Sequence, residues 1–160
     1  MTTTISKTVI APTWNVQKIQ ETVAKVQANQ LLTTMEVLAK NGGDKAIEEF
    51  QTAMRLHKVE HYKAIGVKTP IELAKAIGEF EANVFGSKVE VWGDDKQASI
   101  QYNACAIWNA IEKTGKLTPE HKEAMGAKMQ NCMSLLAKEF GFKGETKFEG
   151  ESCCVVSFSK

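Results

Sequence analysis

Two histidines stand one helical turn apart in a stretch with the periodicity of an amphipathic helix. His57 and His61 share a stripe with Phe50, Met54 and Ile65, at successive spacings of four, three, four and four. This spacing is typical of the side of a helix that faces a protein core. Because a buried imidazole needs a partner for each ring nitrogen, the pair predicts a structural, a catalytic or substrate-contacting, or a metal-binding role.

The metal alternative follows from the same spacing. Imidazoles at positions i and i+4 have the geometry by which one helix offers two ligands to one ion. On this interpretation His57 and His61 bind zinc or another divalent metal, and thiols are natural additional ligands. The chain has no Cys-x-x-Cys pair, so a closed structural zinc site is not expected.

Three thiols are expected to point toward the same interior. Cys105 follows a predicted strand at the start of a helix, where the positive helix end lowers a thiol pKa and favours a nucleophile. Cys132 lies on an apolar helical stripe, and Cys154 shares a strand face with Val156 and Phe158. These three thiols join the two histidines as candidate catalytic residues. The alternative for each is a small buried hydrophobe.

Other patterns that carry chemistry are few. The sequence has no glycine-rich phosphate loop and no Gly-x-Ser-x-Gly elbow. Glu79 and Glu81 are candidates for a general base, and a solvated helix face explains them equally well. The chemistry that the sequence favours is therefore that of histidines and cysteines lining one pocket.

The first half of the chain, residues 15–86, must position the histidines, and it is predicted to be helical. An apolar helical period runs over residues 15–40, stops at Asn41-Gly42-Gly43 and resumes to about residue 65. Thr69 then caps another helix, with Pro70 in its first turn, which closes at Gly86.

The second half must position the thiols. Alternating apolar residues predict a hairpin over residues 87–103, with Asp94-Asp95 at its turn. Helices follow over 104–141, and a final hairpin covers 144–158. Helices followed by strand pairs indicate an α+β fold, in which one antiparallel sheet of about four strands from two hairpins packs against helices.

The composition bounds the domain organisation and the partners. At 160 residues we expect a flexible N-terminus over residues 1–14 and a single domain over 15–160. The net charge is +1, from 20 basic and 19 acidic residues. The composition therefore shows no excess of positive charge of the kind that binds nucleic acid or an anionic membrane. No apolar run approaches the roughly 18 residues of a membrane span, and the first residues lack a secretory signal.

These observations predict a cytoplasmic protein with reduced thiols and a small-molecule substrate or ligand. Neither nucleic acid nor membrane is an expected partner. The sequence does not fix whether the long N-terminal helix packs within its own chain or on a partner, and a homo-oligomer also stays open.

The second half also resembles a known family. Glu-Ala-Asn-Val-Phe-Gly at 81–86 leads into a hairpin and Cys105, Cys132 follows, and Gly-Glu-Ser-Cys-Cys-Val-Val-Ser-Phe lies at 150–158. Over roughly residues 40–158 the chain resembles the L-2-amino-thiazoline-4-carboxylic acid hydrolase family, and it is similar to small-molecule-binding domains of the 4-vinyl-reductase type. It departs from the first family at Val156, where a Phe is usual, and in its doubled cysteine.

The resemblance implies a compact α+β fold and a hydrolase that opens a small ring containing nitrogen and sulfur, with Cys105, Cys132 and Cys154 as the matching positions. The leading hypothesis is a small-molecule hydrolase acting on a C–N or C–S bond, with Cys105 as nucleophile and a neutral histidine of the pair as base. One alternative is a non-catalytic domain that binds a small molecule or a metal. Another is a metal-dependent enzyme with His57 and His61 as ligands.

Overall fold

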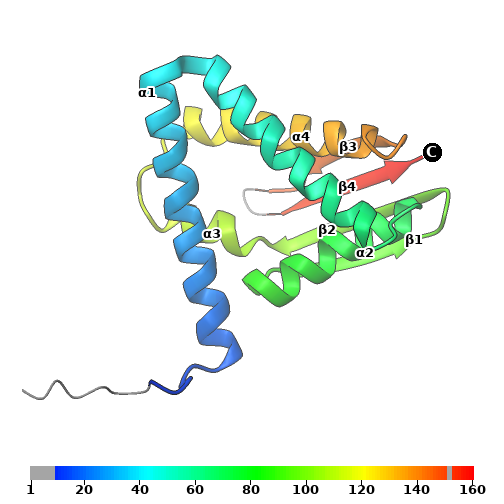
Figure 1. Cartoon of the computed structure of the whole chain (residues 1–160), viewed down its shortest axis with the longest axis horizontal. Coiled ribbons are helices and arrows are strands. Elements are labelled where there is room, and N and C mark those ends of the chain that lie inside the picture. The colour runs from blue at the N-terminus through cyan, green and yellow to red at the C-terminus, as the bar shows by residue number, and fades with distance from the viewer. Residues whose placement is uncertain (1–9, 151–152) are drawn as a thin grey trace, which may run out of the picture.

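A computed structural model describes residues 10–150 and 153–160 of the chain, as helices packed on one sheet (Figure 1). The prediction of a flexible segment over residues 1–14 falls, for residues 1–9, outside the described residues. In chain order the elements are α1 (Val16–Ala64), α2 (Pro70–Phe80), the π-helix η1 (Glu81–Phe85), β1 (Lys88–Gly93), β2 (Gln97–Ala104), α3 (Ala106–Glu112), α4 (Pro119–Lys138), β3 (Lys143–Phe148) and β4 (Cys154–Ser159).

The strands of the described residues form one antiparallel sheet of four in the order β1-β2-β4-β3. Each hairpin therefore supplies one edge strand and one central strand. The two central strands pair with Tyr102 opposite Cys154. At the first turn the Asp94 carboxylate accepts hydrogen bonds from the backbone N–H groups of Lys96 and Gln97. The α+β fold predicted from two hairpins and flanking helices is confirmed.

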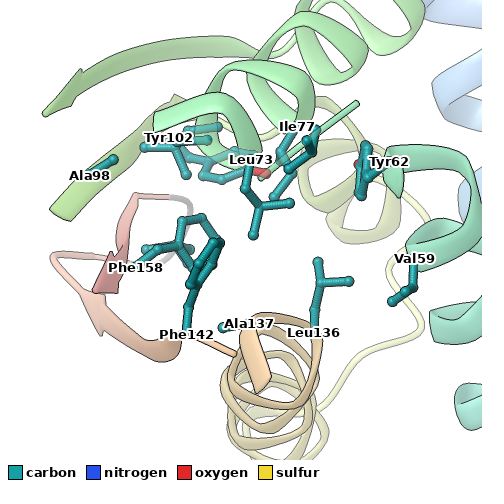
Figure 2. Packing of buried hydrophobic residues seen from close by; sticks show 14 of the residues in the cluster. Val59, Tyr62, Leu73, Ile77, Ala98, Tyr102, Leu136, Ala137, Phe142 and Phe158 are labelled. Atoms are coloured by element: carbon teal, nitrogen blue, oxygen red, sulfur yellow. The ribbon is translucent and has the colours of Figure 1, made fainter. Parts of the chain in front are cut away.

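The core lies between one face of this sheet and the helices. Ile100 and Tyr102 of β2 and Val156 and Phe158 of β4 are at most 1% exposed, because alternate residues of a strand share one face. Figure 2 shows Tyr102 and Phe158 between α2 and α4, with Leu73 of α2 beside them. Within the described residues no helix is long and apolar enough to cross a membrane.

The long helix α1 is bent at the predicted glycine break. Gly43 has φ 60° and ψ −155°, a conformation outside the helical region that glycine adopts without steric cost. The break predicted at Asn41-Gly42-Gly43 therefore separates two helical arms, which meet at a kink. The two arms of α1 diverge at this bend in Figure 1, and the first arm lies against α3.

The helix after Thr69 begins as predicted and ends differently. Thr69 and Glu72 form a reciprocal capping box, with Pro70 in the first turn. The sequence predicted one helix to Gly86, but the last turn, η1, is a π-helix in which the Gly86 N–H donates to the Glu81 carbonyl. A π-turn holds one residue more than an α-turn, and such turns occur frequently at functional sites.

Close packing of α4 on β3 predicts a sensitive position at Gly144. A Cβ there would lie 2.8 Å from the Ala137 Cβ and 2.9 Å from the Met133 carbonyl oxygen. We expect Gly144→Ala to lower the free energy of unfolding by about 1–3 kcal/mol, because the helix must move away from the strand. Chemical denaturation measures this change.

The matched control is Gly126→Ala, also on the α4 side of the fold. A Cβ at Gly126 would lie 3.7 Å from the Phe148 ring, which is ordinary contact. Because alanine favours a helix over glycine by about 1 kcal/mol, this variant is expected to be as stable as the natural chain or more so. Equal losses in the two variants would contradict the close approach at Gly144.

Candidate active site

The structure corrects the expectation that His57 and His61 face the core. Both lie on the second arm of α1 and both are exposed. Of the other members of the predicted stripe, Met54 is 43% exposed and Ile65 is 58% exposed. The His57 imidazole lies 3.7 Å from the Glu60 carboxylate, and both side chains are more than three-quarters exposed.

A second stripe on the same arm forms the buried face. Ile47, Val59 and Tyr62 are each at most 8% exposed, and the Arg55 side chain beside them is 13% exposed and paired with Glu139. Apolar residues occur on both sides of this helix, so periodicity alone did not distinguish the face that packs. The second stripe is buried because of a tertiary contact, in which Tyr62 packs into the core formed by α2 and β2.

Exposed histidines predict a weak response to substitution. We expect His57→Gln and His61→Gln each to change the free energy of unfolding by less than about 0.5 kcal/mol, because exposed ion pairs contribute little. Urea denaturation of each single variant and of the double variant measures this. A loss of several kcal/mol in either variant would mean that the side chains are buried after all.

The structure does not support the metal alternative for this pair. Over residues 10–150 and 153–160 no three side chains of His, Cys, Asp or Glu come together in a way that would hold an ion. His57 and His61 therefore present two imidazoles without a third protein ligand from that part of the chain.

A different acidic residue occupies the interior. Glu81 opens η1 and is only partly exposed, whereas Glu79, the other carboxylate candidate, is exposed on α2. Helix α1 holds η1 in place, because the Gln20 side-chain amide donates to the carbonyl oxygens of Ala82 and Asn83 at 3.0 and 3.1 Å. These bonds satisfy carbonyl groups near the helix end that would otherwise lack a donor.

A buried serine connects Glu81 to the residue after Cys105. The Ser87 hydroxyl donates to the Glu81 carboxylate at 2.9 Å and accepts from the Ala106 N–H at 3.1 Å. Cys105 is the N-cap of α3, and its Sγ accepts from the Trp108 N–H at 3.5 Å. One hydroxyl group therefore bridges the carboxylate and the backbone beside the thiol.

Two tyrosines and a second thiol complete this group of side chains. Tyr62 of α1, Tyr102 of β2 and Cys154 of β4 are each at most 6% exposed, and Cys105 packs against the core to which they belong. We call the group the Glu81 cluster. Its members are Glu81, Ser87, Tyr62, Tyr102, Cys105 and Cys154.

Electrostatic effects within the Glu81 cluster favour protonated side chains. Burial raises the pKa of Glu81, while the hydrogen bond from Ser87 and the charge of Lys58 lower it in part. Burial and the Glu81 charge raise the pKa of Tyr62 to about 12 and that of Tyr102 well above its ordinary value. Both phenols therefore stay protonated at neutral pH.

The thiols respond in the same direction, which corrects the expectation for Cys105. The sequence predicted a lowered pKa at a helix start, but burial raises the pKa of Cys105 more than the N–H groups of Trp108 and Ile107 lower it. Burial, with the charge of Cys105, raises the pKa of Cys154 to about 12. A thiolate at either position therefore needs a base to take its proton.

The remaining cysteines lie elsewhere. Cys132 is half-buried on α4, which packs on edge strand β3, whereas η1 contacts β1 at the opposite edge of the sheet. Cys153 lies just before β4, and its thiol donates to the Asn103 carbonyl oxygen at 3.4 Å. The structure thus brings Cys105 and Cys154 into one group and separates Cys132 from them along the sheet.

Sequence reasoning missed most of the Glu81 cluster, although one signal for Glu81 was present. Leu73, Ile77, Glu81 and Phe85 follow one another at intervals of four, and the three apolar members are buried. An acidic residue on such a stripe is expected to be partly shielded from solvent, as Glu81 is. The hydrogen bond from Ser87 could not be predicted from the sequence, because it depends on a turn that brings Ser87 back to Glu81.

Comparison with known proteins leaves the site to be argued from its own geometry. The chain matches no protein-family model and no curated protein.

Proposed function

We propose that the protein is a small-molecule hydrolase that cleaves a C–N or C–S bond with Cys105 as nucleophile and Glu81 as general acid and base. The observation that carries the proposal is the Ser87 hydroxyl, which bridges the Glu81 carboxylate and the Ala106 N–H next to Cys105. The Glu81 charge also acts on the Cys105 thiol and raises its pKa, so the carboxylate and the thiol belong to one electrostatic group, as a base and its nucleophile must. Glu81 replaces the histidine base that the sequence suggested.

The electrostatics favour this division of roles. A thiol whose pKa is raised is protonated at neutral pH and attacks only when a base accepts its proton. A carboxyl group whose pKa is raised is a better base than an ordinary carboxylate, and it is a better acid afterwards. Burial thus raises the proton affinity of the base as well as that of the thiol.

The proposed substrate class is a small ring with an amidine-type carbon bonded to nitrogen and sulfur, the class implied by the resemblance. Cys105 gives its proton to Glu81 and bonds to that carbon, and the ring C–S bond then breaks as Glu81 protonates the leaving sulfur. Water next gives a proton to Glu81 and its hydroxyl to the same carbon. The bond to Cys105 breaks, the thiol regains the proton, and one water is consumed with no oxidant or reductant.

The tyrosines would serve as hydrogen-bond donors in this scheme. Tyr62 and Tyr102 keep their protons across the neutral range, and a fixed donor stabilises negative charge that develops on a reacting nitrogen or sulfur. The proposed partner is thus a small molecule in the cytoplasm, where thiols stay reduced. No cofactor is needed by these steps.

A second candidate function is non-catalytic binding of a small molecule by the Glu81 cluster. The raised pKa values of Cys105 and Cys154 favour it, because a binding site gains nothing from a reactive thiolate. In that case the thiols would act as apolar contacts, and Glu81 with the two tyrosines would supply polar ones.

One experiment separates the two functions. Purified full-length protein is incubated with 2-amino-thiazoline-4-carboxylate, the ring-opened product is quantified by chromatography, and binding is measured by calorimetry. Ring opening by the natural protein, lost in Cys105→Ser, supports the hydrolase. Binding without turnover supports the second function. Turnover that is unchanged in Cys105→Ser would exclude this thiol as the nucleophile.

A further inference from the structure

The first arm of α1 carries more apolar surface than its own domain covers. Ala24 and Ala28 form its inward side and are 4% and 0% exposed. A second row of β-branched residues stands beside them on the same helix and keeps substantial exposure. Val16 is 66% exposed, Ile19 is 46% exposed, and Val26 is 49% exposed.

The spacing of this second row is that of a helix-pairing surface. Val16, Ile19, Val23 and Val26 follow one another at intervals of three, four and three, the a and d positions of a heptad repeat. We call these four residues the α1 seam. Apolar residues at such positions form the surface by which two helices pack together.

The charge pattern beside the α1 seam is compatible with pairing of like surfaces. The flanking positions carry only uncharged side chains, so two copies would meet without like-charge repulsion. These positions are Gln20, Thr22, Gln27 and Asn29. The nearby charged residues, Lys18, Glu21 and Lys25, project from other sides of the helix.

The first arm of α1 is also capped at its start and anchored to the rest of the domain. The Asn15 side chain caps its first turn by accepting from the Lys18 N–H at 2.8 Å, and Gln20 ties it to η1. In Figure 1 this arm stands at one side of the molecule, away from the sheet. A helix that is already formed and anchored loses little conformational entropy when a second helix packs on it.

We propose that the α1 seam binds the α1 seam of a second copy of this chain, forming a two-fold symmetric dimer. Such an interface is self-complementary, since each residue meets its equivalent surface on the partner. The four seam residues span 11 positions of the helix, about one and a half heptads, whereas a sustained coiled coil runs over at least about three. The dimer is therefore reversible, and its population rises with protein concentration.

Sedimentation velocity of the full-length chain over a concentration series tests the proposal. The natural protein is expected to shift from monomer to dimer as concentration rises. Val26→Glu places a charge in the seam and is expected to weaken dimerisation by at least about tenfold. The matched control is Lys25→Gln, which changes the net charge by the same amount on an exposed side outside the seam, and it is expected to dimerise like the natural protein.

Two further measurements make the outcome decisive. Thermal melts followed by circular dichroism show whether Val26→Glu is folded, and Val16→Glu, at the most exposed seam position, replaces it if it is not. A natural protein that stays monomeric throughout, or a folded seam variant that dimerises normally, would overturn the proposal. Monomers that co-sediment with lipid vesicles only while the seam is intact would assign this surface to a membrane instead.

Discussion

Glu81→Gln is expected to stabilise the protein at neutral pH and to lower hydrolysis by about 10²–10⁴-fold. Burial raises the pKa of Glu81, so the folded state disfavours the carboxylate. Glutamine is uncharged and still accepts the hydrogen bond from Ser87. Removing one poorly solvated charge is worth on the order of 1 kcal/mol, or about 2–4 °C in Tm. The activity falls because glutamine neither accepts nor returns a proton.

The pH dependence of the stability gain gives this prediction its sign. A carboxyl group with a raised pKa in the folded state contributes its full stability below its ordinary pKa of 4.5. That contribution is lost as the pH rises through the raised value. The advantage of Glu81→Gln over the natural protein should therefore be absent below pH 4.5 and grow toward neutral pH, as denaturation at a series of pH values would measure.

Glu79→Gln is the matched control, since it makes the same chemical change at an exposed position two residues away. We expect its stability to stay within about 0.5 kcal/mol of the natural protein and its activity to be unchanged. If Glu81→Gln were less stable than the natural protein at pH 7, the carboxylate would be well compensated and the proposed base would be wrong.

Cys105→Ser is expected to leave the protein folded and to reduce hydrolysis at least about a thousandfold. Cys105 caps α3 through a sulfur acceptor, and serine is a better cap than cysteine, so stability is expected to hold or rise by up to about 1 kcal/mol. The hydroxyl is a far weaker nucleophile under the same base. Circular dichroism and product chromatography on the same sample measure both effects.

Cys132→Ser controls for general effects of thiol replacement. This residue lies half-buried on α4, and its element packs at the other edge of the sheet from η1. Its variant is expected to keep full activity. Equal loss of activity in the Cys132 and Cys105 variants would argue that the thiols act through packing rather than through chemistry.

Local signals predicted most of the fold. The helix cap at Thr69, the glycine break at Gly43 and the turn at Asp94 are determined by a few neighbouring residues, and each lies where the sequence placed it. Alternating residues also indicated the inward faces of β2 and β4 correctly. These features can be predicted from the sequence because interactions among a few neighbouring residues determine their stability.

The candidate site was harder to predict, because its members meet through tertiary contacts. Helical periodicity predicted that the face with His57 and His61 is buried. In the structure the adjacent face is buried instead, and Tyr62 on that face packs into the core. The π-turn that begins at Glu81 has no local signature comparable to a cap. The direction of the Cys105 pKa shift depends on how deeply α3 starts within the fold, which a helix-end argument omits.

The pairing of β2 with β4 has a consequence for how the chain folds during synthesis. Residues 97–104 must wait for residues 154–159 before the centre of the sheet can close. Contacts so distant in sequence form slowly and late. We therefore expect α2 and the first hairpin to form while the apolar face that they share is still open. Tyr102 meets Cys154 only once β4 has joined the sheet, so the Glu81 cluster is complete only after that pairing.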